Sequence, residues 1–115
     1  MSVIYSDFLE FAKSLPYDSE INNRNSASRA YYAAFNKCRD HYGAEFEITV
    51  KGGTHEQLIR YIGGSSDKKD KEIAYQLMQA RKLRTTADYE LTVDFNKSDR
   101  ITALIYAEAI TKSCK

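Results

Sequence analysis

Two polar triplets with identical spacing carry the side chains of this 115-residue chain that are best suited to chemistry. Each triplet lies in an apolar helical run, and steps of three and then four residues place its members on one helix face. The triplets are Arg29, Tyr32 and Asn36, and Arg81, Arg84 and Asp88. Guanidinium groups one helical turn apart can clamp a phosphate, so the two triplets are candidates for a shared phosphate-binding or RNA-binding site.

A purely structural role accounts for the same residues equally well at the level of sequence. Asp88 can pair with Arg84 or with Arg29, which would tie two helices together through a buried ionic network. The first triplet would then be an exposed helix face that makes ordinary salt bridges. Both interpretations stay open.

His55 is the candidate proton carrier, and together with Arg84 it forms the candidate catalytic pair. It falls in the first turn of an expected helix, where the positive end of the helix dipole favours a neutral imidazole that can act as a base. Next to Thr54, it can equally serve as a local hydrogen-bonding residue. The chain has no phosphate loop, dinucleotide fingerprint or metal-binding motif, so we expect no metal and no cofactor.

Composition limits where a binding surface can come from. The chain has 17 Lys and Arg against 16 Asp and Glu, a net charge of +1, so any basic site must be local.

Cys38 and Cys114 lie far apart and belong to no ligand motif, and the N-terminus lacks the pattern of a signal peptide. We therefore expect a reduced, cytoplasmic setting. A membrane span is not expected, because it needs roughly 18 consecutive apolar residues.

Helix signals occupy most of the chain. Apolar residues recur at helical spacing, and Pro16, Gly43 and the pair Gly63 and Gly64 mark helix ends. Asp18 to Glu20 and Asn96 or Ser98 offer N-caps, while Thr54 and Gln57 have the spacing of a capping box. Residues 46–50 alternate like a strand but have no partner strand, and are interpreted as a loop. We also interpret 65–71 as a solvated connection. The expected helices span about residues 2–15, 54–62, 69–88 and 99–112, and another begins near the cap candidates at 18–20 and ends at about 42.

These helices predict an all-α, up-and-down four-helix bundle with an additional short helix, formed by residues 1–115 as a single domain. The last helix is apolar all round, which indicates burial between other helices or in a dimer. The second helix has a core stripe at helical spacing, made of Ala27, Ala30, Tyr31, Ala34, Cys38 and Tyr42.

Three landmarks in order resemble the HEPN superfamily, especially its small single-domain prokaryotic members. They are the run Ser28 to Phe35 (SRAYYAAF), then Thr54 and His55, then the run Arg84 to Tyr89 (RTTADY). The resemblance covers residues 26–89. It implies a helical bundle, often a homodimer, that takes part in toxin-antitoxin, anti-phage or CRISPR-linked systems.

The resemblance also implies an activity. Many HEPN proteins are metal-independent endoribonucleases that use an Arg followed after four to six residues by a His, and neither His41 nor His55 has such an Arg. The sequence therefore leaves two functions open. One is binding or cleavage of RNA or a nucleotide, and the other is a non-catalytic helical module that binds an antitoxin or defence-system protein.

Overall fold

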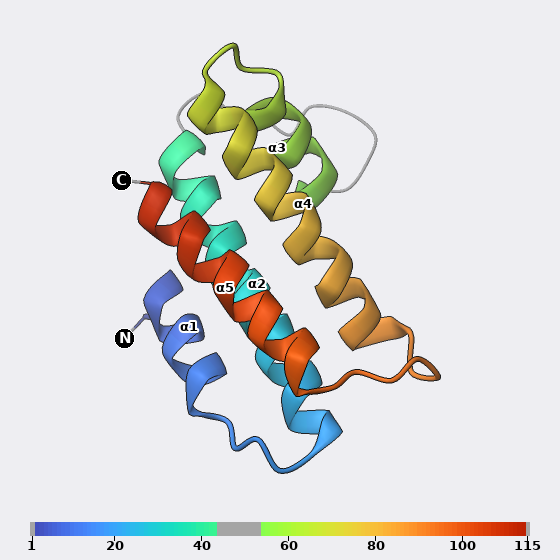
Figure 1. Ribbon diagram of the computed structural model, residues 1–115. Coiled ribbons are helices and arrows are strands. Elements are labelled where there is room, and N and C mark those ends of the chain that lie inside the picture. The colour runs from blue at the N-terminus through green and yellow to red at the C-terminus, as the bar shows by residue number, and fades with distance from the viewer. Residues whose placement is uncertain (1, 44–53, 115) are drawn as a thin grey trace.

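The computed structural model describes residues 2–43 and 54–114, and its regular structure over these ranges is entirely helical. Four helices run alternately up and down, and the short α3 packs against α4 at one end of the bundle (Figure 1). The expected all-α helical bundle is confirmed. The helices are α1 (Tyr5–Ser14), α2 (Glu20–Tyr42), α3 (Thr54–Gly63), α4 (Lys68–Tyr89) and α5 (Lys97–Ser113).

Local side-chain caps set several helix ends as expected. Ser19 accepts a hydrogen bond from the backbone N–H of Asn22 at 3.3 Å, which starts α2. Asn96 and Asp99 form a capping box at the start of α5, with bonds of 2.9 and 3.0 Å. The connection expected over 65–71 already ends at Asp67. The side chain of Asp67 accepts a hydrogen bond from the backbone N–H of Lys69 at 2.7 Å and so caps α4, which begins at Lys68.

Two expectations fall outside the described part of the chain. These are the loop interpretation of residues 46–50 and the capping box that uses the Thr54 side chain.

The core lies where α2 crosses the other helices. The predicted α2 stripe is buried from Ala27 to Cys38, and Tyr42 at its end is half-buried. Small residues let α1, α4 and α5 approach α2 closely, while large apolar side chains fill the space around them. The larger buried members are Leu58, Ile62, Ile73, Leu77 and Ile110.

The last helix is only partly enclosed by this chain. Ala103, Ala107 and Ile110 of α5 are buried against the bundle. Ile101 and Ile105 are 39% and 62% exposed. Within the single chain, neighbouring helices therefore bury one side of α5, and the alternative that a dimer buries the other side stays a prediction.

A buried arginine from α5 holds the end of α1. Arg100 has no solvent exposure, and its guanidinium donates to the carbonyl oxygens of Ala12, Leu15 and Pro16 at 3.2, 2.5 and 3.0 Å. It also donates to the side chain of Asn23 at 3.3 Å. Carbonyl groups at a helix C-terminus lack partners within the helix and carry partial negative charge. Arg100 therefore caps α1 from the opposite end of the sequence.

Arg24 of α2 caps the C-terminal end of α4 in the same way. One terminal guanidinium nitrogen donates to the carbonyl oxygens of Thr86, Ala87 and Glu90 at 3.0, 3.1 and 3.3 Å, and the other terminal nitrogen donates to that of Val93. The Nε of Arg24 donates to the carboxylate of Glu20 at 3.0 Å. Only 5% of Arg24 is exposed. This contact fixes the turn that leads from α4 to α5.

No described helix combines the length and the apolar character that crossing a membrane would require.

Candidate functional site

The two polar triplets meet where α2 packs against α4. Asp88 accepts a hydrogen bond from the hydroxyl of Ser28 at 3.1 Å. The same carboxylate oxygen lies 2.9 Å from Nε of Arg84, in an ion pair without an aligned hydrogen bond. Arg29 joins through Ser28, to whose oxygen it donates at 3.2 Å. The predicted pairing of Arg84 with Asp88 is thus present, and Arg29 reaches Asp88 through a serine.

Tyrosine rings surround these guanidinium groups. The Cζ atom of Arg29 lies 4.2 Å from the ring centroid of Tyr32. The Cζ atom of Arg84 lies 5.8, 5.6 and 5.4 Å from the ring centroids of Tyr31, Tyr32 and Tyr89. At these separations the negative ring faces attract the cations and hold them in place without neutralising them.

His55 reaches the same place from the first turns of α3. Its Nδ1 lies 2.7 Å from the hydroxyl oxygen of Tyr31, so one hydrogen bond joins the two groups and either can donate it. Its ring packs against Phe35, with 4.2 Å between centroids, and edge-on to Tyr32 at 6.5 Å. The imidazole is thereby fixed by α2, and the bond at Nδ1 leaves Nε2 available.

Electrostatics keep His55 neutral and Tyr31 protonated. Burial, followed by the positive charges of Arg84 and Arg81, lowers the pKa of His55 from its usual 6.5. Burial raises the pKa of Tyr31, although Arg81 and Arg84 oppose that rise. At pH 7 the pair is therefore an uncharged imidazole bonded to an uncharged phenol.

We call this group the arginine–histidine cluster. It comprises Arg29, Tyr31, Tyr32, His55, Arg81, Arg84 and Asp88. Asn36, the remaining predicted member, turns back on its own helix and donates to the carbonyl oxygen of Tyr32 at 2.8 Å.

Positive charge exceeds negative charge in the cluster. Three arginines stand against one carboxylate, that of Asp88. Within the described residues, neither Arg29 nor Arg81 forms an ion pair. Close cations repel one another unless an anion lies between them, so the cluster favours an anionic ligand.

Two surface hollows flank the cluster, and each includes one of its arginines. One hollow of about 280 Å³ is lined by Val3, Asp7, Phe8, Phe11 and Arg29. The other, about 340 Å³, is lined by Met78, Arg81, Lys82, Thr85, Thr86 and Glu90. The second presents the cations of Arg81 and Lys82 and the hydroxyl of Thr85, beside the carboxylate of Glu90, which accepts a hydrogen bond from the hydroxyl of Thr86 at 2.9 Å.

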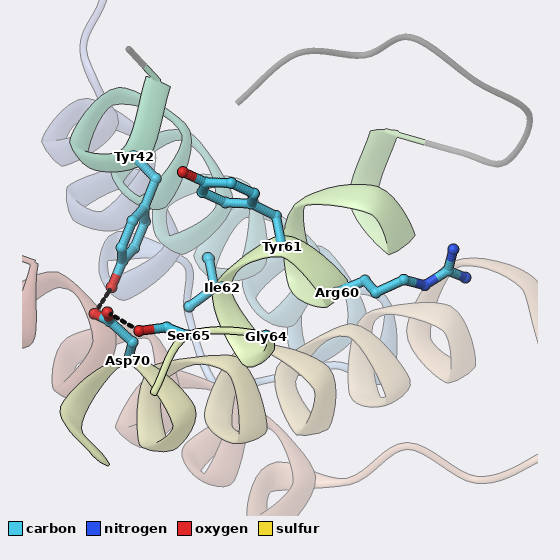
Figure 2. A pocket seen from close by; sticks show the side chains of 7 residues that line it. All are labelled: Tyr42, Arg60, Tyr61, Ile62, Gly64, Ser65 and Asp70. Atoms are coloured by element: carbon cyan, nitrogen blue, oxygen red, sulfur yellow. Dashed lines mark hydrogen bonds between the residues drawn. The ribbon is translucent and has the colours of Figure 1, made fainter. Parts of the chain in front are cut away.

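A larger hollow of about 510 Å³ lies at the α3 end of the bundle (Figure 2). The hydroxyls of Tyr42 and Ser65 both donate to Asp70, at 2.6 and 2.8 Å, and these bonds lower the pKa of that carboxyl group. Arg60 extends away from them and pairs with Glu56 at 2.5 Å. The polar groups of Tyr42, Ser65 and Asp70 thus bond one another, and they tie the end of α2 to the start of α4.

Sequence reasoning missed one member of the cluster and several side chains that contact it. It assigned Tyr31 to the core stripe and gave no role to Ser28, Phe35 or Tyr89. The hydroxyl on Tyr31 was the available signal, because a buried phenol needs a hydrogen-bond partner. Nothing local shows that this partner is His55, which lies 24 residues away.

The described residues contain no group of three or more His, Cys, Asp or Glu side chains placed to bind a metal ion. No protein-family model matches the chain, and neither a curated protein nor a solved structure matches it.

Proposed function

We propose that this protein is a small HEPN-type domain that binds RNA or a nucleotide at the arginine–histidine cluster. The observation that carries the proposal is the charge imbalance there: among the described residues Arg84 pairs with the one carboxylate, Asp88, whereas Arg29 and Arg81 form no ion pair, and the histidine beside them is neutral. Phosphate oxygens are acceptors that match the donors of Arg29, Arg81 and Arg84. The ordered landmarks of the sequence add the family resemblance and its prokaryotic toxin-antitoxin or defence setting.

Each part of the cluster has a task in this proposal. The guanidinium groups of Arg81 and Arg84 bind phosphate, and the ring of Tyr32 offers a face for stacking. Cleavage would require a group that moves a proton at the ribose 2′-hydroxyl. Because its Nδ1 is bonded to Tyr31, His55 would use Nε2 for that step. Binding needs only the cations, so the two activities can be separated by mutation.

The binding test compares Arg81→Gln with Lys71→Gln, which removes the same charge at an exposed position of α4 outside the hollow. Fluorescence anisotropy with a labelled mixed-sequence RNA should show a dissociation constant about 10-fold higher for Arg81→Gln, with little change for Lys71→Gln. Equal affinity for wild type and Arg81→Gln would contradict the proposal.

Cleavage is tested separately by gel electrophoresis of the same RNA after incubation without metal. His55→Ala should abolish cleavage while keeping RNA affinity within about 3-fold, because removing a proton carrier affects the chemical step. Intact RNA with the wild-type protein would leave binding as the function and reject the ribonuclease version.

Exposed apolar side chains favour a second candidate, a helical module that binds a partner protein. Val3, Ile4 and Phe11 of the N-terminal segment are 66%, 60% and 51% exposed. On α5, Ile101 and Ile105 offer a face for a homodimer. Light scattering after size exclusion, together with co-purification with the products of neighbouring genes, tests this candidate. A monomer that retains no antitoxin or defence protein would contradict it.

A further inference from the structure

Two cysteines that are far apart in the sequence lie in contact in the fold. Cys38 of α2 and Cys114, the residue after α5, are separated by 76 positions, and their sulfur atoms are 3.6 Å apart. Both are free thiols with no solvent exposure. Figure 1 shows the end of α5 beside the last turns of α2, so the two chain segments already stand where a cross-link would join them.

The surroundings make Cys114 the more reactive thiol of the pair. The hydrogen bond shared with Cys38, helped by the charges of Lys37 and Lys69, lowers the pKa of Cys114 against the effect of burial. The thiolate is the form that attacks a disulfide. Cys38 lies deeper in α2, and the same hydrogen bond together with burial raises its pKa. Cys38 thus has the properties of a resolving thiol.

A small oxidant can reach this pair through the end of α5. The backbone N–H of Cys114 bonds to the carbonyl oxygen of Ile110 at 3.0 Å, which closes the last turn. The final turn of a helix opens at lower free energy than the core does. Opening there would expose Cys114 and leave α2 in place.

We propose that Cys38 and Cys114 are a redox modification site that a low-molecular-weight disulfide converts into an intramolecular disulfide between α2 and the end of α5. The Cys114 thiolate attacks one sulfur of oxidised glutathione, which forms a mixed disulfide and releases one glutathione thiolate. Cys38 then loses its proton to solvent and attacks the sulfur of Cys114, which releases the second glutathione. Two protein thiols are oxidised and one glutathione disulfide is reduced to two thiols.

Oxidation would affect the turn of α2 that also serves the arginine–histidine cluster. Cys38 lies three residues after Phe35, whose ring packs against that of His55. The cross-link also closes a long loop, which restricts the unfolded chain.

The experiment incubates the folded, purified chain with oxidised glutathione, quenches it by denaturation in N-ethylmaleimide, and measures the intact mass. We expect a protein that takes up no maleimide, runs as a monomer on a non-reducing gel, and melts roughly 10 °C higher than the reduced form. Reduced protein should take up two maleimides.

Cys38→Ser and Cys114→Ser are the matched controls, with folding verified by circular dichroism. Cys38→Ser should stop at the mixed disulfide with glutathione, and Cys114→Ser should react much more slowly. Three results would overturn the proposal: a wild-type protein that keeps both thiols, one that ends as a mixed disulfide, or one that forms a disulfide between two chains.

Discussion

Two groups of arginines lie on the helices of this bundle, and they differ in what receives their N–H donors. Arg24 and Arg100 are buried, and backbone carbonyl oxygens at the ends of α4 and α1 accept most of their hydrogen bonds. The arginines of the arginine–histidine cluster are only partly buried; aromatic rings lie against Arg29 and Arg84, and a single carboxylate pairs with Arg84. Both groups are cations on helices, so residue type alone does not separate them.

The difference shows how a structural cation can be told from a binding cation. An arginine whose donors are used by the fold has no capacity left for a ligand, and its removal leaves buried carbonyl groups unpaired. An arginine held by aromatic rings keeps most of its donors, since Arg29 donates only to Ser28 and Arg84 only to Tyr32 among the described residues, and the fold tolerates its loss better. Replacing an arginine of the first kind should therefore lower the free energy of unfolding. Replacing one of the second kind should change ligand affinity and the pKa values of nearby groups.

The largest effect is expected for Arg100→Met. Methionine preserves much of the apolar stem but leaves the carbonyl oxygens of Ala12, Leu15 and Pro16 without their donor. The free energy of unfolding should fall by about 3 kcal/mol, measured by urea denaturation. Lys112→Met, at an exposed position of the same helix, should change it by less than about 0.5 kcal/mol. A loss under about 1 kcal/mol for Arg100→Met would contradict the distinction between structural and binding arginines.

A smaller and more local effect is expected for Arg24→Met. Several of its carbonyl partners lie in the exposed turn after α4, where water can replace part of the lost bonding, so we expect a loss of about 2 kcal/mol. Hydrogen exchange should quicken at the N–H groups of Glu90 and Val93, which bond within that turn. Arg39→Met, exposed on the same helix, is the control. Uniform exchange changes across the bundle would argue against a local capping role.

The smallest effect is expected for Arg81→Gln, and it concerns a pKa. Burial and the charges of Arg84 and Arg81 lower the pKa of His55, so removing Arg81 should raise it. A proton NMR titration of the imidazole measures this directly, with Lys82→Gln as the control. An unchanged His55 pKa in Arg81→Gln would show that Arg81 does not act on His55 and does not belong to the cluster.

The same titration has a consequence for stability. Because the pKa of His55 is lowered in the native state, the unfolded chain takes up this proton at higher pH than the native chain does. His55 therefore reduces the free energy of unfolding as the pH falls below 6.5. Arg81→Gln should weaken that dependence, since it brings the two pKa values closer together.

The sequence by itself determined the helices, because their signals are short-range. The cap at Ser19 acts over three residues, and so does the box between Asn96 and Asp99. Equal spacing likewise predicted that each polar triplet shares a face, which a helix enforces through its own geometry. These features need no knowledge of what packs against the helix.

Only the tertiary structure decided which side chains meet. Arg100 reaches Pro16 across 84 positions, Tyr31 reaches His55 across 24, and Cys38 reaches Cys114 across 76. Each contact depends on how two distant segments of the chain pack together, and the sequence of either segment alone does not specify it. Helix packing thus gave Arg100 and Arg24 carbonyl partners and left the cluster arginines with donors for a ligand. That distribution separates the structural arginines from the candidate site.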